Sequence, residues 1–431
     1  MDLQQETADV LSRLIRFNTV NPPGDEREAM EWLRAYLEDA GLACELAGAS
    51  PERPNLVAAL RGEADDGPVL GYLGHVDTVL ADPGAWTRDP WSGDQADGFV
   101  WGRGALDMKD QVAAEVVAAA ALAREGWRPP RGALMVFAVV DVETGGHHGA
   151  QWLCRERPDL ARCDYLLNEG AGSVMPYDGR RYYGVCVAEK GTFRFTVTAR
   201  GTAGHASVPA MTRNALLELA PALERLATAQ LPFDVTPEIA ELLRGLGEDP
   251  GDPAAAVERV AEVEPRLAPF VRANCQVTLA PTQIRASEKI NVIPAVAELR
   301  VDARAPAGMD GDAVLERIRP AIGGDLELEW LETVVGNRSS FDTPLMAAIR
   351  DWIGEVDPGA QAVPTVLPAF TDSRWWRDAF PECVAYGFMP QRHQSLYDGW
   401  PLIHGADERI DVRDLGFAVS FFHELPRRLL K

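Results

Sequence analysis

Four short and almost uninterrupted apolar runs in the first 170 residues constrain the fold of this chain most strongly. They read NLVAALRG, GPVLGYLGHVD, GALMVFAVVD and CDYLLNEG, and helical stretches from Gln111 to Arg124 and from Ala150 to Arg155 lie between the later runs. Strands that are apolar throughout are buried on both faces, and their alternation with helices is typical of a parallel sheet covered by helices. The sequence therefore predicts an α/β domain with a mostly parallel central sheet.

The pattern changes after Glu189, where polar and apolar residues begin to alternate. This alternation runs through KGTFRFTVTARG and NVIPAVAELRVDARAP, and it is typical of half-exposed antiparallel strands. Helices are predicted after Thr212 and from Asp310 to Ile322, and DLELEWLE is predicted as a further strand. We therefore expect an α+β domain of two helices and four strands, inserted into the first domain.

Within this inserted domain, residues 232–270 are acidic and are interrupted by Pro and Gly, which indicates a helical excursion. After residue 340, a helix from Pro344 to Val356 and the short strand CVAYGF indicate a return to the first domain. The expected boundaries are 1–188 and 340–431 for the first domain and 189–339 for the inserted one.

The charge balance limits the classes of partner. Lys and Arg number 42 against 65 Asp and Glu, which gives a formal net charge of −23. This acidity opposes binding to phosphate backbones and to anionic membranes, and no basic run in the sequence offsets it. We therefore expect neither nucleic acid nor a membrane as a partner.

The first residues, MDLQQETADVLSRLIRF, lack the positive flank and apolar stretch of a secretory signal. No apolar run reaches the roughly 18 residues that a membrane helix needs. The six cysteines show no CxxC spacing and sit mostly among apolar neighbours, which is typical of reduced, structural thiols. We expect a cytoplasmic protein.

Several side chains that commonly bind metals lie at the ends of the predicted strands or in loops. They are His75 and Asp77 after the second run, Asp107 in a Gly-rich turn, Glu143 and Glu169 after the next two strands, and His404 in a late loop. Taken singly, each has a plain alternative: a polar strand end for His75, or a helix N-cap for Asp107. The carboxyl ends of strands are where open α/β sheets place their sites. Apart from Asp77, which lies beside His75, the two histidines and the other three carboxylates form a ligand set for two zinc-like ions that share one carboxylate.

At this point the sequence resembles a known family, the two-zinc amidohydrolases and exopeptidases that include aminoacylase, succinyl-diaminopimelate desuccinylase and the glutamate carboxypeptidases. The motifs that carry the resemblance are GHVDTV, GRGALDMK, VDVETGG, LLNEGAG, EKGTFRFTVTARGTAGHASVP, NVIPAVAELRVDARAPAG, FTDSR with YGFMP, and IHGADERI. They occur in the order of the family and span nearly the whole chain. The resemblance implies a zinc-exopeptidase-like catalytic domain with an inserted lid and dimerisation domain.

The resemblance also implies roles for individual residues. His75, Asp107 and Glu169 would hold one divalent ion, and Asp107, Glu143 and His404 would hold the other. Zinc is the expected metal, with Co²⁺ or Mn²⁺ as alternatives, and Asp77 would orient His75.

Other implied roles concern a small substrate that carries a carboxylate, and a second subunit. The lid would pair two subunits into a homodimer and bring His205 into the partner's site as an oxyanion donor, with Asn291 as a further lid residue of the substrate site. Arg304, Arg338 and Arg374 are candidates to bind the carboxylate of the substrate; the alternative for each is a surface ion pair.

One position departs from the family. There the strand ends in Asp-Glu-Glu-x-Gly, and the first glutamate takes a proton from the attacking water and passes it to the leaving nitrogen. Aligned on Gly145, this sequence places Glu143 at the metal position and Val142 at the position of the base. Valine cannot accept a proton, and losing a general acid–base group costs about 10²-fold to 10⁴-fold in rate.

Three interpretations of Val142 remain open. Another group could replace the base, namely His147, His148 or Asp141, although Asp141 is expected on the opposite side of the strand. The chain could instead perform non-hydrolytic, metal-assisted chemistry on a small amino-acid-like substrate, or it could be a silenced metal-binding homologue. The intact ligand set argues against the last interpretation.

Overall fold

The structure is a computed structural model that describes residues 2–323 and 326–431. It divides into two compact units. Unit 1 contains the chain up to Val187, Ser339–Thr365 and Thr371–Lys431, and unit 2 contains Ala188–Arg338 and Val366–Phe370. Unit 2 differs from the range expected for the inserted domain by one residue at each end and by the addition of Val366–Phe370.

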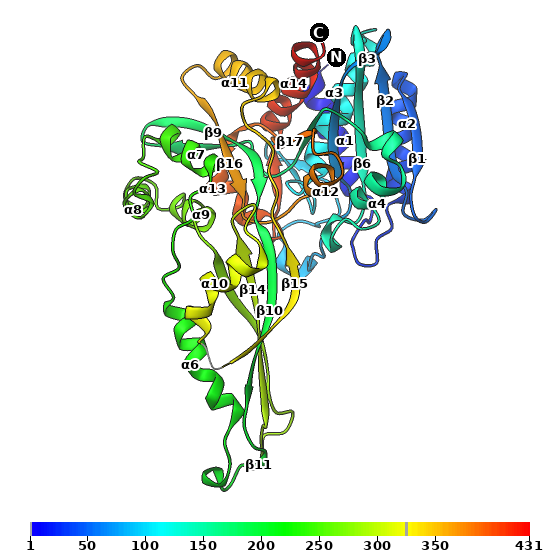
Figure 1. Cartoon of the computed structure of the whole chain (residues 1–431). Coiled ribbons are helices and arrows are strands. Elements are labelled where there is room, and N and C mark those ends of the chain that lie inside the picture. Colours follow the sequence, from blue (N-terminus) through cyan, green and yellow to red (C-terminus); the bar gives the residue numbers. More distant parts are fainter. Residues whose placement is uncertain (1, 324–325) are drawn as a thin grey trace. The chain divides into compact units, whose positions relative to one another are not determined.

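Unit 1 is built on a ten-stranded sheet with the order β1-β2-β6-β3-β7-β17-β9-β8-β18, in which β16 also pairs with β9 (Figure 1). The strands are β1 (Ala43–Ala47), β2 (Asn55–Arg61), β3 (Ala64–His75), β6 (Arg131–Val139), β7 (Tyr165–Asn168), β8 (Ser173–Tyr177), β9 (Arg180–Glu189), β16 (Gln361–Leu367), β17 (Val384–Gly387) and β18 (Gln391–Ser395). The four central strands β6, β3, β7 and β17 run parallel, whereas β1, β2 and β9 join the sheet in antiparallel fashion. The predicted fold class is confirmed.

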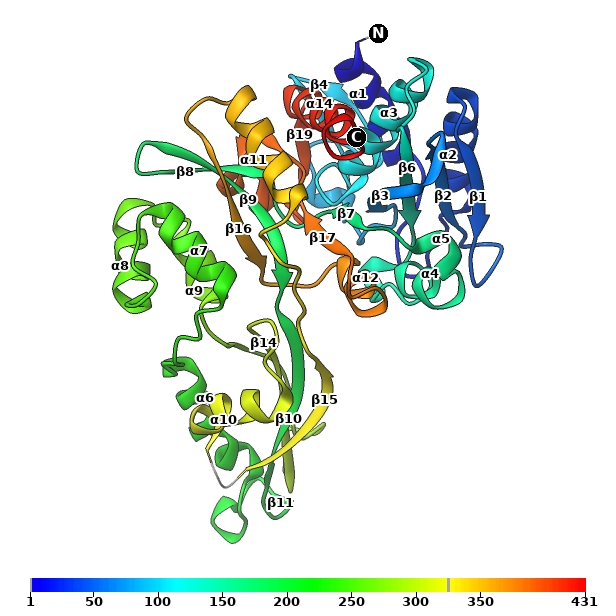
Figure 2. The same ribbon diagram turned by 45° about the horizontal axis from the view of Figure 1, so that its top comes forward.

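Helices cover both faces of this sheet. They are α1 (Leu3–Ile15), α2 (Arg27–Ala40), α3 (Lys109–Arg124), α4 (Ala150–Glu156), α5 (Pro158–Ala161), α11 (Pro344–Val356), α12 (Ser373–Ala379), α13 (Leu396–Gly399) and α14 (Val412–Leu429). Helix α3 lies beside α1 and α14 (Figure 2). It is buried on nearly all sides, because its Ala and Val side chains are small enough for close packing.

The opposite face of the sheet forms a separate hydrophobic core. Phe137 of β6 contacts Trp376 of α12 with ring centroids 5.3 Å apart, and α4 and α5 contribute Leu153 and Ala161 to the same cluster. Residues two apart on β6, such as Met135 and Phe137, point into this core because side chains alternate along a strand. The central strands are therefore apolar on both faces, as their sequences predict.

Unit 2 contains the predicted domain of four strands and two helices. Its antiparallel sheet has the order β12-β14-β10-β15, and its elements are β10 (Gly191–Arg200), α6 (Ala215–Thr228), β12 (Thr278–Arg285), β14 (Val296–Ala305), α10 (Gly311–Ile322) and β15 (Glu327–Val334). Phe193 and Val301 of the sheet share one core with Leu219 and Ile318 of the helices. Asp325, at the start of the predicted strand DLELEWLE, lies outside the described residues.

The predicted helical excursion is also confirmed, as α7 (Pro237–Leu246), α8 (Pro253–Val263) and α9 (Ala268–Asn274). Two small sheets complete the fold: β11 (Gly204–His205) with β13 (Val292–Ile293) in unit 2, and β4 (Gln95–Ala96), β5 (Phe99–Trp101) and β19 (Arg409–Asp411) in unit 1. All six cysteines are free. Within residues 2–323 and 326–431, no helix has the length and apolar character to cross a membrane.

Candidate metal centre

Two groups of potential metal ligands meet in unit 1 and share one carboxylate. We name them the Glu169 set (His75, Asp107 and Glu169) and the Glu143 set (Asp107, Glu143 and His404). In each set, the ligand atoms lie within 4.8 Å of one another. The five residues come from positions between 75 and 404, so the fold and not local sequence brings them together.

The parallel strands explain the position of the Glu169 set. His75 is the last residue of β3, and Glu169 directly follows β7, the next strand in the sheet. Asp107 precedes helix α3, whose cap residue is Met108; the alternative role of Asp107 as an N-cap is therefore wrong. The carboxyl ends of the central strands thus carry the site, as expected for an α/β sheet.

Glu143 lies further from its strand than the sequence suggested. Strand β6 ends at Val139, and Glu143 sits in a 3₁₀ turn, Val142–Thr144. Asp141 takes a left-handed conformation (φ 77°) just before this turn, and Gly145 (φ 113°) follows it. The premise that residue 141 still belongs to the strand is wrong, because β6 has already ended and its alternation no longer applies.

Asp107 lies between the two histidines. Its Oδ1 is 3.2 Å from His75 Nε2, and its Oδ2 is 3.0 Å from His404 Nε2. Each carboxylate oxygen therefore faces a different ligand set, as a bridging ligand requires.

The outer carboxylates complete the two sets. Glu169 Oε1 lies 3.8 Å from His75 Nε2, and Glu143 Oε1 lies 3.6 Å from His404 Nε2. Glu143 Oε1 is buried and accepts no hydrogen bond from any described residue. Imidazole and carboxylate donors without thiolate suit zinc, cobalt or manganese, so the residues present fit a pair of divalent ions.

The charges in the cluster favour bound cations. The neighbouring carboxylates of Asp107 and Glu143 raise the pKa of His404 to about 10. Burial lowers the pKa of His75, but the neighbouring Asp107 and Asp77 outweigh burial and raise this pKa. Burial, together with the charge of Asp107, raises the pKa of Glu169. The cluster thus retains protons that a divalent cation would replace.

Asp77 contacts parts of both sets. It is fully buried, and its Oδ1 lies 3.4 Å from His75 Nδ1, while the backbone carbonyl oxygen of Asp77 is 2.9 Å from the same nitrogen. Its carboxylate also accepts the backbone N–H groups of Val142 (3.3 Å) and Glu143 (3.1 Å). The sequence predicted only that Asp77 orients His75. The contact of Asp77 with the turn that carries Glu143 was not predicted.

Val142 is partly exposed. The nearest candidate to replace the missing base is Asp141. The carboxylate of Asp141 accepts hydrogen bonds from Asn21, Arg53, Thr144 and the backbone N–H of His148. Although burial acts in the opposite direction, these donors lower the pKa of Asp141. This carboxylate therefore holds the turn and is a poor candidate for the missing base.

The two histidines after the glycines lie at the surface. His147 is exposed, and its Nδ1 is 2.9 Å from Gln151 Oε1. His148 is also exposed, and it contacts Asp141 through its backbone N–H. Neither histidine belongs to the two ligand sets.

The three candidate arginines have local partners. In unit 1, the guanidinium of Arg374 lies over the ring of Trp375, 4.2 Å from its centroid. In unit 2, Arg304 donates to Asp302 at 2.7 Å, and Arg338 donates to the carbonyl oxygen of Ala307.

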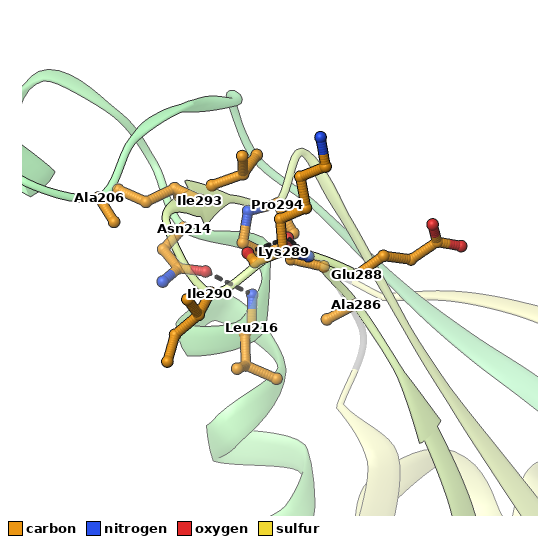
Figure 3. A pocket seen from close by; sticks show the side chains of 11 residues that line it. Ala206, Asn214, Leu216, Ala286, Glu288, Lys289, Ile290, Ile293 and Pro294 are labelled. Carbon is orange, nitrogen blue, oxygen red and sulfur yellow. Dashed lines mark hydrogen bonds between the residues drawn. The ribbon is translucent and has the colours of Figure 1, made fainter.

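His205 and Asn291 lie near each other in unit 2. His205 in β11 is paired with Val292 of β13, and the carbonyl oxygen of Asn291 accepts the N–H of Ala206. A pocket of about 460 Å³ is lined by side chains that include Ala206 and Ile290, which are adjacent in sequence to His205 and Asn291. Figure 3 shows these side chains together with Asn214, Leu216 and Ile293. The side chain of His205 is exposed, and its Nδ1 contacts Ser207 Oγ at 2.7 Å.

A second group of buried residues, which was not predicted from the sequence, surrounds the candidate ligands. Glu408 Oε1 accepts the backbone N–H groups of Leu106 (2.7 Å) and Asp107 (3.2 Å), and its other oxygen pairs with Arg103. Arg103 also donates to the carbonyl oxygen of Gly405, at 2.9 Å, next to His404. This ion pair joins the loops that carry Asp107 and His404. The only available signal was the placement of both charges inside the GRGALDMK and IHGADERI motifs.

Comparison with known proteins identifies the family of this chain. The profile of Peptidase family M20/M25/M40 matches residues 71–428. A succinyl-diaminopimelate desuccinylase from Cereibacter sphaeroides is 32% identical over 415 residues, which cover 93% of each chain.

Two solved structures share the fold. An M20 family metallo-carboxypeptidase from Sulfolobus solfataricus superimposes with a TM-score of 0.74 at 18% identity and covers 99% of both chains. A dinuclear metal-binding peptidase of the M20 family from Bacillus subtilis gives a TM-score of 0.60 at 15% identity, covering 98% of this chain and 97% of its own. Because the profile spans most of the sequence, this protein belongs to Peptidase family M20/M25/M40, as an enzyme of the metallopeptidase and amidohydrolase type.

Proposed function

We propose that this protein is a metal-dependent amidohydrolase that acts on the amide bond of an N-acyl amino acid or a small peptide. The observation that carries this proposal is the position of Asp107, which presents one carboxylate oxygen to each ligand set. The names of its relatives, a desuccinylase and a metallo-carboxypeptidase, support the same class of reaction.

The two ligand sets would hold two divalent ions, zinc in the first instance and Co²⁺ or Mn²⁺ as alternatives. When bound, such ions polarise a carbonyl group and lower the pKa of water towards ~7. The residues of the chain fix the positions of the ligands. Asp107 is shared by the two sets, and Asp77 contacts both the ring of His75 and the backbone of Glu143.

Val142 limits the rate that this site can reach. Its side chain cannot remove a proton, and the carboxylate of Asp141 is already occupied by four hydrogen bonds. The expected cost of the missing base is about 10²-fold to 10⁴-fold. This observation also favours a second candidate function, a non-hydrolytic reaction in which the metal ions polarise a carbonyl or carboxylate of a small amino-acid-like substrate.

A homodimer through residues 189–339 forms part of the proposal. Large apolar side chains are exposed in unit 2, among them Met211, Leu217 and Ile290, and β12 is an edge strand of the four-stranded sheet. An exposed edge next to apolar side chains favours pairing with another chain, and a second copy is the partner proposed here. In this arrangement His205 would serve the partner's site.

A substrate with a carboxylate requires a cationic partner. Arg374 is the candidate that lies in the same unit as the ligand sets, and a guanidinium can bind a carboxylate through two parallel N–H groups.

Metal analysis combined with a substrate screen tests the proposed function. We expect about two divalent ions per chain, because each ligand set offers three donor residues. We also expect slow product formation from N-acyl amino acids or dipeptides, measured by release of the free amine. Substoichiometric metal under zinc-replete conditions would overturn the proposal.

A further inference from the structure

A buried ion pair contacts Asp141, the residue directly before the turn that carries Val142 and Glu143. The guanidinium of Arg53 donates to both oxygens of Glu26, at 2.8 and 2.6 Å, and to Asp141 Oδ1 at 3.1 Å. The side chain of Glu26 is fully buried, and that of Arg53 is 16% exposed. All three residues precede or follow elements of unit 1, and none belongs to either ligand set.

The turn depends on the side chain of Asp141. A left-handed conformation such as φ 77° is unfavourable for a residue other than glycine, and it persists only where surrounding contacts hold it. Asn21, Thr144 and the backbone of His148 supply neutral donors to Asp141, whereas Arg53 supplies the charged one among the described residues. Hydrogen bonds between charged groups are stronger than those between neutral groups.

The surroundings of Arg53 restrict its guanidinium to one place. Both oxygens of Glu26 bind it in a bidentate arrangement, which fixes its plane. On another side, Gly24 leaves the space that the guanidinium fills: a Cβ at residue 24 would lie 2.3 Å from Arg53 Cζ. Glu26 and the backbone at Gly24 therefore fix the position of the guanidinium independently of its hydrogen bond to Asp141.

We propose that Arg53 is a positioning residue for the metal ion of the Glu143 set. It acts through Asp141, whose conformation determines where the next two residues place their side chains. The inference rests on the proposed function, because it assumes that both sets hold ions. The two ions should depend differently on Arg53, because His75 ends β3 and Glu169 follows β7, and neither residue is among the hydrogen-bond partners of Arg53.

Electrostatics alone predicts the opposite effect. Arg53 is a cation in the same unit as two cation sites, so its removal should strengthen the binding of both ions through reduced repulsion. A positioning role predicts weaker binding at one set only. The sign of the change therefore separates the two roles.

The experiment measures zinc affinity and not turnover. Metal-free protein is titrated with Zn²⁺ against a competing chelating indicator, which yields two stepwise dissociation constants. Glu143→Gln and Glu169→Gln identify which step belongs to which set. Arg53→Met should raise the dissociation constant of the step identified by Glu143→Gln by about 10-fold to 100-fold, the usual effect of losing a residue that orients a ligand. The other step should change by less than about threefold, because its ligands keep their own supports.

Two further variants control for loss of folding and for an effect of the Arg53 charge alone on zinc affinity. The double variant Glu26→Gln with Arg53→Met removes both buried charges, and it should fold where the single variant does not. Arg53→Lys keeps the charge and loses the fork of donors, so it should weaken the same step. Arg157→Met is the matched control, because Arg157 pairs with Glu45 and Asp159 at the surface of the same unit.

Three results would overturn the assignment of Arg53. They are tighter binding of both ions, an equal loss at both steps, or unchanged affinities in Arg53→Met and Arg53→Lys. If the unmodified protein itself fails to bind two ions, the proposed function falls instead, and this outcome is visible before any variant is made.

Discussion

The carboxylate of Asp77 accepts the backbone N–H of Glu143 at 3.1 Å while one of its oxygens lies 3.4 Å from the ring of His75. One buried carboxylate therefore supports a ligand from each set. Because the contact with residue 143 runs through the backbone, it fixes the turn whatever side chains the turn carries. This explains how a valine can occupy position 142 without displacing Glu143.

Asp77→Asn tests this double contact. An amide nitrogen at residue 77 faces the N–H groups of Val142 and Glu143, so at least one donor loses its acceptor. We expect the free energy of unfolding to fall by about 1–3 kcal/mol, the cost of an unsatisfied buried polar group. Zinc affinity should fall at both steps. Chemical denaturation and zinc titration measure these effects, and a variant that loses affinity at only one step would contradict the double role.

Asp107→Ala should remove both ions, because its two oxygens face different sets. His404→Ala should weaken mainly one, since His404 belongs to the Glu143 set alone. Elemental analysis after gel filtration measures both variants under identical conditions. If Asp107→Ala keeps a full complement of metal, Asp107 does not bridge the ions.

Zinc affinity should fall as the pH falls. The acids around His404 raise its pKa from 6.5 to about 10 in the metal-free protein, so below that pH an ion must displace a proton from the ring. Between pH 9 and pH 6 the apparent dissociation constant should rise by about tenfold per pH unit for each proton displaced. Proton release measured in weakly buffered solution checks this, and pH-independent affinity would show that His404 is not a ligand.

The same shift affects the stability of the metal-free protein. A raised pKa in the folded state means that the stabilising contribution of His404 is complete below its unfolded pKa of about 6.5 and is lost as the pH rises through about 10. Half of the side chain is exposed, so solvent screening keeps this contribution small.

The sequence predicted the fold and the candidate ligands because strands and strand ends have local signals. Apolar runs gave the central strands, and ligands such as His75 and Glu169 stand directly at the ends of those strands. The supporting residues have no such signal: Arg103 and Glu408 are 305 residues apart, and Arg53 and Asp141 are 88 residues apart. The strand was predicted to continue through residue 141, two residues past the observed end of β6.

His205→Ala should lower activity with little effect on stability. The side chain is exposed in unit 2, so its removal leaves no buried cavity. Loss of an oxyanion donor typically costs about 10²-fold to 10³-fold in turnover. Sedimentation should show a dimer at micromolar concentration, as the proposed role of His205 requires. A monomer with full activity, or a large fall in melting temperature at unchanged turnover, would contradict this role.

Val142→Glu should increase the hydrolysis of a suitable N-acyl amino acid or dipeptide. The backbone N–H of residue 142 is bonded to Asp77, which holds the turn, so the new carboxylate should occupy the position at which the sequence resemblance implies a base. The expected gain is one or more orders of magnitude, consistent with the scale of about 10²-fold to 10⁴-fold for general acid–base catalysis.

Val142→Gln is the matched control for this gain, because its side chain has nearly the same size and cannot take a proton at neutral pH. Both variants should retain two ions by elemental analysis. A gain in Val142→Glu alone, with little hydrolysis by the unmodified protein, supports a site that lacks only its base. Brisk hydrolysis by the unmodified protein would mean that another residue removes the proton, and His147→Ala and His148→Ala would then identify it. If Val142→Glu binds both ions and gains nothing on a broad substrate panel, the missing carboxylate is not what separates this protein from its hydrolytic relatives.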